Sequence, residues 1–112
     1  MPLINLRTSL PSVSDADGLL KALSCTLAQQ TGKPEAYVMT LMEVGVPMTF
    51  AGSTEPSAYV EIKSIGALQP PAMTAAFCEL ISERTGIPAN RIYIGFDDVK
   101  ASAWGWNGNT FG

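Results

Sequence analysis

The sequence predicts an α/β domain made of two consecutive β-α-β units, and three observations favour this fold class. The motif Thr-Gly-x-Pro occurs at residues 31–34 and again at residues 85–88. Each copy follows a segment whose apolar residues recur with the period of an α-helix. Strand-like apolar runs flank each of these helical segments. Such self-similarity indicates that one structural unit occurs twice along the chain.

Two helices are expected, one before each Thr-Gly-x-Pro motif. Their apolar residues lie three or four positions apart, as on one face of a helix: Leu19, Leu20, Leu23 and Leu27, then Met73, Phe77, Leu80 and Ile81. Ser14 or Asp15 can cap the first helix, and the prolines at 70–71 suit the first turn of the second. Gly32 and Gly86 are placed to end the helices, with a proline two residues on.

Strands are expected at residues 3–8, 37–44, 57–65 and 91–96, and a short strand near 104–106 is a candidate to close a sheet edge. Because β-α-β crossovers are right-handed, both helices should cover the same face of a four-stranded mixed sheet. The two halves of the pseudo-repeat then span about residues 2–50 and 57–104 of a single domain, residues 1–112.

The other face of such a sheet has no cover within one chain. Hydrophobic residues make up 46% of the sequence and charged residues 15%, whereas soluble domains average about 25% charged residues. A chain of 112 residues has room for one core. Apolar side chains on the bare face would be covered if several copies closed around an axis, so we expect a tight homo-oligomer.

Composition argues against several classes of function. A net charge of −3 and a pI near 4.7 do not supply the basic face that nucleic acid requires. No apolar run approaches the roughly 18 residues of a membrane span, so no membrane association is expected. The absence of His excludes imidazole zinc sites and His-dependent nucleophilic triads. We expect neither a metal nor a cofactor.

The two cysteines, Cys25 and Cys78, fall within the expected helices. We expect both to be small packing residues rather than a disulfide or a nucleophile. No charged-then-apolar segment typical of a signal peptide is recognised at the N-terminus. A reducing, cytoplasmic location is therefore expected.

Pro2 has the most informative chemistry in the chain. Initiator methionine is normally trimmed when a small residue follows, which would leave Pro2 with a free secondary amine. Burial beside a cation disfavours the protonated amine and lowers its pKa, and a neutral amine near pH 7 can act as a general base. Alternatively, Pro2 simply begins an edge strand, where it forfeits no ladder hydrogen bond.

Segments along the whole chain resemble the macrophage migration inhibitory factor family of the tautomerase superfamily. No single segment is specific, but they keep their order and near-constant spacing from Pro2 to Phe111. The matching segments are Pro2, Thr31-Gly32-Lys33-Pro34, Gly52-Ser53-Thr54-Glu55-Pro56, Ser64-Ile65-Gly66, Arg91-Ile92-Tyr93-Ile94, Gly105-Trp106-Asn107 and Thr110-Phe111.

The resemblance implies a homotrimer whose sheets form a central barrel, with active sites between adjacent subunits. It also implies keto–enol tautomerisation of 2-keto acids such as phenylpyruvate, with the Pro2 nitrogen as base. Lys33 would be the cation near the amine, and the Ile65 backbone N–H would bind a substrate oxygen. Tyr93 of a neighbouring subunit would form the pocket wall. The apolar rim would consist of Tyr37, Trp106 and Phe111.

The chemistry of a 2-keto acid supports these roles independently. Its tautomerisation needs a base at the acidic C–H and a cation or N–H donors for the oxygens. Pro2 and Lys33 supply a base and a cation, and aromatic walls suit a phenyl ring. Each assignment has an alternative: Lys33 as a solvated loop charge, Ile65 as a packing side chain, Tyr37 and Tyr93 as ordinary strand aromatics, and Trp106 and Phe111 as interface packing.

The sequence also departs from the mammalian family members. Residues 57–60 replace their Cys-x-x-Cys, so redox chemistry through that motif is absent. Gly95 stands where they have an Asn that touches the far end of aromatic substrates, and Trp104 replaces a smaller aliphatic residue near the pocket mouth. A non-catalytic binding or signalling module is the alternative to the enzyme, and blocking the N-terminus would distinguish the two.

Overall fold

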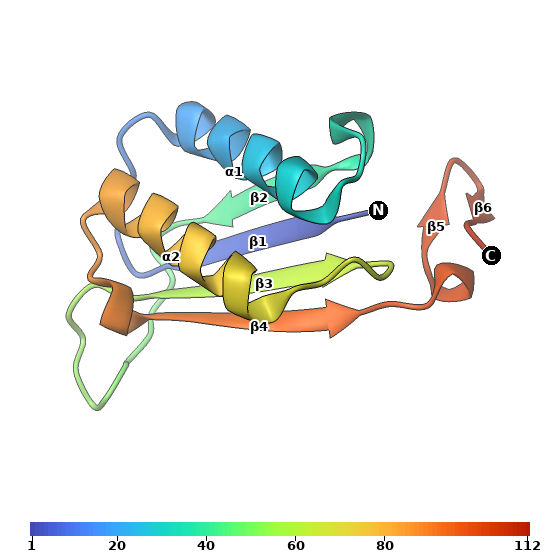
Figure 1. Ribbon diagram of the computed structural model, residues 1–112. Coiled ribbons are helices and arrows are strands. Elements are labelled where there is room, and N and C mark those ends of the chain that lie inside the picture. The colour runs from blue at the N-terminus through green and yellow to red at the C-terminus, as the bar shows by residue number, and fades with distance from the viewer.

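The computed structural model describes residues 1–112 and consists of two β-α-β units followed by a short C-terminal hairpin (Figure 1). The first unit is β1 (Leu3–Thr8), α1 (Ala16–Thr31), the 3₁₀ turn η1 (Glu35–Tyr37) and β2 (Met39–Glu43). The second unit is β3 (Ala58–Ser64), α2 (Pro70–Thr85), η2 (Ala89–Arg91) and β4 (Ile92–Asp98). The chain ends with η3 (Ala101–Ala103), β5 (Gly105–Trp106) and β6 (Asn109–Thr110).

The four long strands form one mixed sheet in the order β2-β1-β3-β4. Each unit contributes a parallel pair, and the two units meet through the antiparallel pair β1 and β3. Both helices lie on the same face of this sheet, as Figure 1 shows. The predicted fold class is confirmed. Some strand boundaries differ. Residues 37 and 91 belong to the 3₁₀ turns η1 and η2, which follow Pro34 and Pro88, and not to β2 and β4. The last strand also continues to Asp98, beyond the predicted end at residue 96.

The Thr-Gly-x-Pro motif has the same structure in both units. The hydroxyl of Thr31 donates to the carbonyl of Leu27 at 2.7 Å, and Thr85 repeats this bond to Ile81 at 2.6 Å. The glycine that follows has a φ of 68° in the first unit and 77° in the second, a conformation that glycine adopts without steric cost. The motif therefore ends each helix and directs the chain back toward the sheet.

The core lies between the helices and the inner face of the sheet. Every second residue of β1 and β3 points into it, as the alternation of a strand requires. The helices meet these strands with Leu19, Leu23 and Leu27 from α1, and with Met73, Phe77 and Ile81 from α2. Asp15 caps α1 by accepting a hydrogen bond from the Gly18 amide at 3.2 Å. Neither helix is long and apolar enough to cross a membrane.

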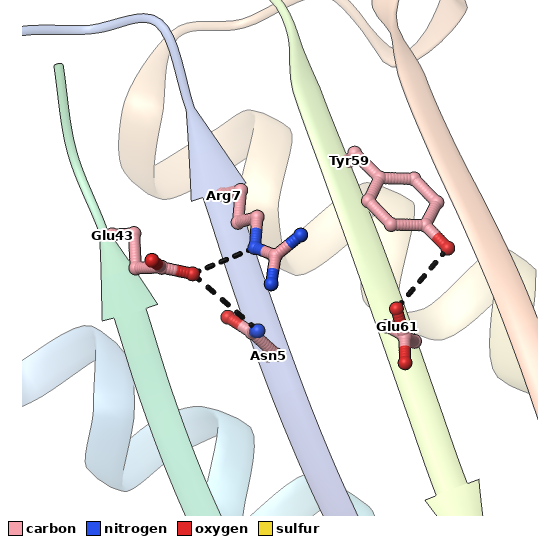
Figure 2. Close-up of polar contacts among 5 residues, drawn as sticks. All are labelled: Asn5, Arg7, Glu43, Tyr59 and Glu61. Carbon is pink, nitrogen blue, oxygen red and sulfur yellow. Dashed lines mark hydrogen bonds and ion pairs between the residues drawn. The ribbon is translucent and has the colours of Figure 1, made fainter. Parts of the chain in front are cut away.

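The outer face of the sheet is more polar than the sequence analysis predicts. Arg7 donates to the carboxylate of Glu43 at 2.6 Å, and the amide of Asn5 approaches the same oxygen at 3.5 Å (Figure 2). This hydrogen bond from Arg7 holds the pKa of the Glu43 carboxyl below its ordinary value. The Lys63 ammonium lies 3.4 Å from the carboxylate of Glu61. The alternation that buries one side of each strand places these charges on the other side.

Apolar side chains on the outer face gather mainly at its ends. Met39 is 61% exposed at one end of the sheet, and Tyr93 is 65% exposed at the other. Tyr59 is partly exposed beside Tyr93, and its hydroxyl donates to Glu61, as Figure 2 shows. The exposed apolar surface is therefore not one continuous layer, and an oligomer that covered this face would enclose a largely charged sheet centre.

Two further expectations need correction. The short strand predicted near residues 104–106 does not extend the main sheet; β5 pairs with β6 in a separate hairpin. Cys25 is exposed and is not a packing residue, because it lies on the solvent side of α1. Cys78 is partly buried against the core, as predicted, and burial raises the pKa of its thiol.

Candidate functional site

Pro2 is buried and directly precedes β1. Its carbonyl accepts a hydrogen bond from the Met39 amide at 3.1 Å, which fixes the residue to β2. Beside it opens a cleft of about 230 Å³ lined almost entirely by apolar side chains. The lining residues are Met1, Leu3, Ala36, Tyr37, Val38, Met39, Trp104, Gly105, Trp106 and Phe111.

Aromatic rings from three segments form one wall of this cleft. The rings of Tyr37 and Trp106 meet edge to face with centroids 5.7 Å apart, and Trp106 stacks on Phe111 at 6.0 Å. The hairpin that carries Trp106 turns at Asn107 and Gly108, both with positive φ, and Asn-Gly is the pair that such a tight turn favours. The rings suit a flat aromatic ligand at the N-terminal end of the sheet.

The electrostatic surroundings of the N-terminus favour a neutral amine. The pKa of the Met1 amine lies below its ordinary value of 8.0, mainly because of burial and secondly because of the charge of Lys33. Lys33 directly follows the glycine that ends α1, so the Thr-Gly-x-Pro motif sets its position. Burial and a nearby cation are the two conditions that the sequence analysis requires for a basic nitrogen at this end of the chain.

Ile65 comes directly after β3, at the same end of the sheet as Pro2. The antiparallel register pairs Leu3 with Lys63, so the residues that follow β3 lie next to the residues that precede β1. The turn after Ile65 is held by a hydrogen bond from the Gly66 amide to the carboxylate of Asp98 at 3.0 Å. The backbone around Ile65 is thereby fixed near the N-terminus.

Comparison with known proteins gives the family. The sequence profile of macrophage migration inhibitory factor (MIF) matches residues 1–112. The chain belongs to the MIF family. It is 39% identical to the macrophage migration inhibitory factor of Meriones unguiculatus over 99% of each chain, and 37% identical to the homolog of Brugia malayi over 100% of each. The MIF family is part of the tautomerase superfamily, in agreement with the resemblance noted from the sequence.

Solved structures of MIF proteins share the fold. The homologue from Prochlorococcus marinus is 57% identical and superposes with a TM-score of 0.95, covering 98% of this chain and 99% of that one. The protein from Trichinella spiralis is 29% identical with a TM-score of 0.92, covering 97% and 99%. The MIF fold is thus retained across the full chain.

One MIF subunit gathers most of the predicted site residues, but not Tyr93. Tyr37, Trp106 and Phe111 line the cleft, while Pro2, Lys33 and Ile65 lie at the same end of the sheet. Tyr93 pairs with Tyr59, which pairs with Arg7 near the far end of β1. Tyr93 can therefore reach a Pro2 cleft only if that cleft belongs to another subunit.

Tyr93 lines a second cleft, of about 360 Å³, at the far end of the sheet. Its ring meets that of Phe50 with centroids 4.7 Å apart. The full lining is Met48, Thr49, Phe50, Ala51, Ser57, Ala58, Tyr59 and Tyr93. A wider groove of about 570 Å³ nearby is lined by residues 9, 45–49 and 54, which include no acid or base. The second cleft, which has aromatic side chains in its lining, suits an aromatic ligand better than this groove does.

Sequence reasoning missed several residues of these clefts. Leu3 and Met39 could have been found, because each lies on the strand face opposite the core in the register of β1 with β2. Trp104 was noted as a departure from the family, and the structure places it in the wall of the first cleft. Phe50 gave no periodic signal, because it belongs to the irregular segment between β2 and β3.

Gly95 has an unusual neighbour. A side chain at this position would begin 3.3 Å from the hydroxyl of Tyr59. The phenol of Tyr59 therefore covers the space that a longer side chain at residue 95 would need. It presents a hydroxyl there, bonded to Glu61 at 3.3 Å.

Proposed function

We propose that this protein is a cofactor-independent keto–enol tautomerase acting on phenylpyruvate-like 2-keto acids, with Pro2 as general base after removal of Met1. One observation carries the proposal. Pro2 is buried beside an aromatic cleft, at a chain end where burial and Lys33 lower the pKa of the terminal amine. A base of this kind removes a proton from carbon most effectively when its pKa lies near the working pH.

In the proposed reaction, the substrate's aromatic ring occupies the cleft walled by Tyr37, Trp106 and Phe111. Its carboxylate and carbonyl oxygens face Lys33 and the Ile65 backbone N–H. The Pro2 nitrogen accepts the proton from the carbon next to the carbonyl, the electrons of that C–H bond form the C=C bond of the enolate, and the carbonyl π electrons move to the oxygen. A proton from solvent on this oxygen completes the enol, Pro2 returns its own proton to solvent, and the reverse sequence gives the keto form. The cation and the N–H donor stabilise the negative oxygen in the transition state.

Removal of Met1 would contribute in two ways. It would convert the Pro2 nitrogen from an amide into a secondary amine, and it would vacate the part of the cleft that Met1 now lines. With Met1 retained, the nitrogen has no free electron pair with which to accept a proton. The proposal therefore depends on processing of the chain.

The proposal includes a homotrimer, as the family resemblance implies, with Tyr93 of one subunit completing the Pro2 cleft of the next. The distance along the sheet between the two ends supports this arrangement, because no single chain unites Pro2 with Tyr93. Exposed aromatic and apolar side chains at both ends, including Met39 and Tyr93, supply surface for such contacts. We further propose a cytoplasmic location, which two free cysteines favour.

The proposed function is tested by measuring phenylpyruvate tautomerisation on protein whose intact mass is known. Turnover is expected when the mass shows that Met1 is absent, and none when Met1 is retained or the amine is acetylated. Absence of turnover in protein that lacks Met1 would contradict the proposal. The non-catalytic binding module would then be the function to pursue.

Replacing Lys33 by Met should change the pH dependence of the reaction. The cation disfavours protonation of the nearby amine, so its removal should raise the pKa of the Pro2 amine. Activity is lost as the pH falls through this pKa, so the acid limb of kcat/KM should move to higher pH. The maximum should fall by about 10²–10³-fold as an oxygen-binding charge is lost.

Lys21→Met on the exposed side of α1 is the matched control, and it should leave both quantities unchanged. The measurement is a pH–rate profile of the three proteins with phenylpyruvate. An acid limb that stays in place in Lys33→Met would show that Lys33 does not act on the amine.

A further inference from the structure

The guanidinium of Arg91 binds four backbone carbonyls of one loop. Its Nε donates to Pro56 at 2.9 Å, and one terminal nitrogen donates to Phe50 at 3.2 Å. The other terminal nitrogen donates to Glu55 at 2.9 Å and to Ser53 at 3.3 Å. Arginine presents five N–H donors in a fixed plane, so a single side chain can hold several carbonyls in one arrangement. Residues 50–56 are thus tied to the start of β4.

Three hydrogen bonds within the loop also support its shape, and in one of them the Glu55 amide donates to the Ser53 hydroxyl at 3.1 Å. Phe50 and Ser53 exchange two backbone hydrogen bonds, of 2.9 and 3.0 Å, around a tight turn. The turn places Ala51 at a φ of 53° and Gly52 at 75°. Alanine disfavours this left-handed conformation, which persists only where surrounding contacts enforce it. Arg91 supplies such contacts, because it binds the carbonyls of both residues that close the turn.

Arg91 also contacts an aromatic ring of the second cleft. Its guanidinium lies 5.3 Å from the centroid of the Phe50 ring, within the range of a cation–π interaction. The Phe50 ring in turn contacts that of Tyr93 at 4.7 Å and 66°. Phe50 and Tyr93 both line the cleft of about 360 Å³. Arg91 therefore contacts Phe50, and Phe50 contacts Tyr93.

We propose that Arg91 is a positioning residue for substrate binding, and that Phe50 forms with Tyr93 a single aromatic wall that Arg91 holds in place. This inference rests on the proposed function, in which Tyr93 completes the Pro2 cleft of a neighbouring subunit. Arg91 touches no reacting atom. It acts by fixing the loop at 50–56, and through it the orientation of the Phe50 ring.

The sequence repeat relates Arg91 to a residue of the first cleft. Tyr37 and Arg91 occupy equivalent positions, each at the end of the 3₁₀ turn that follows Thr-Gly-x-Pro. The amide of Tyr37 donates to Pro34 at 3.0 Å, and that of Arg91 donates to Pro88 at 2.9 Å. The first copy contributes its side chain to the N-terminal cleft, whereas the second uses its side chain to shape the other cleft.

The test is Arg91→Lys, which keeps the charge and loses the planar set of donors. We expect amide exchange at Phe50 and Ser53 to accelerate at least tenfold, because a single ammonium cannot hold four carbonyls. KM for phenylpyruvate should rise about tenfold, since misplaced binding groups can cost up to 10² in efficiency. The value of kcat and the pH of the acid limb should stay unchanged, because Arg91 contacts the loop at 50–56 and touches neither a reacting atom nor the proposed base. Arg84→Lys, at the exposed end of α2, is the matched control.

A second variant, Phe50→Leu, removes the ring and keeps an apolar side chain of similar length. It should raise KM as Arg91→Lys does, while the exchange of the Ser53 amide stays close to that of the wild type. Unchanged loop exchange in Arg91→Lys would overturn the inference. So would a loss of kcat that follows dissociation of the oligomer, because it would show a purely structural role. Amide hydrogen exchange in the loop can be measured without any enzymatic turnover. Failure of the proposed function therefore remains distinguishable from failure of this inference.

Discussion

Replacing Pro2 by Ala is expected to lower kcat/KM for phenylpyruvate by about 10²–10⁴-fold, the range typical of a general base. The loss should lie toward the lower end, because alanine at the N-terminus still offers a primary amine once Met1 is trimmed. Burial and the charge of Lys33 act at this chain end whichever residue occupies it, so the remaining activity should still fall at acid pH. The measurement is steady-state turnover of protein shown by intact mass to lack Met1.

The matched control is Pro11→Ala, which changes an exposed proline beyond the end of β1. It should retain wild-type turnover and the same oligomeric mass. Pro2→Ala should keep that mass as well, since the carbonyl of residue 2 accepts the hydrogen bond from the Met39 amide, and this carbonyl survives the substitution. Wild-type turnover in Pro2→Ala would place the base elsewhere.

The fold could be predicted because local signals and long-range packing agree. Gly32 and Gly86 each end a helix in the left-handed conformation, as their place after a periodic apolar segment indicates. The alternation in β1 buries Ile4 and Leu6 completely. Strand starts shifted where a local turn competed with the strand pattern, as at residue 37.

The outer face of the sheet and the loop at 50–56 could not be predicted in the same way. Arg7 and Glu43 are far apart in sequence, and only the parallel register of β1 with β2 makes them partners. Arg91 belongs to the segment Arg91-Ile92-Tyr93-Ile94 that resembles the family. Its hydrogen-bond partners are backbone carbonyls, whose positions no side-chain pattern encodes. The candidate site residues near Pro2 were named from the family resemblance, which supplies positions that local periodicity does not indicate.

The proposed contribution of Tyr93 to a neighbouring subunit's site yields a prediction that combines two variants, Tyr93→Ala and Pro2→Ala. Tyr93→Ala should lower kcat/KM by about 10–100-fold, the effect of losing one buried aromatic wall of about 1.5–3 kcal/mol. Pro2→Ala loses most of its activity for a different reason, because its N-terminus lacks the secondary amine. If each site takes Pro2 from one subunit and residue 93 from the next, a trimer that contains both kinds of chain regains an intact site.

The arrangement fixes how much activity returns. Around a cyclic trimer with two kinds of chain, only one interface pairs an intact Pro2 with an intact Tyr93, whichever variant is in excess. Mixed trimers, isolated through two different tags after coexpression, should therefore show about one third of wild-type turnover. Two differently tagged copies of Pro2→Ala, treated identically, should keep the low turnover of that variant. If Tyr93 instead served its own chain, no subunit of a mixed trimer would have both residues, and its activity would stay within the range of the two parent variants.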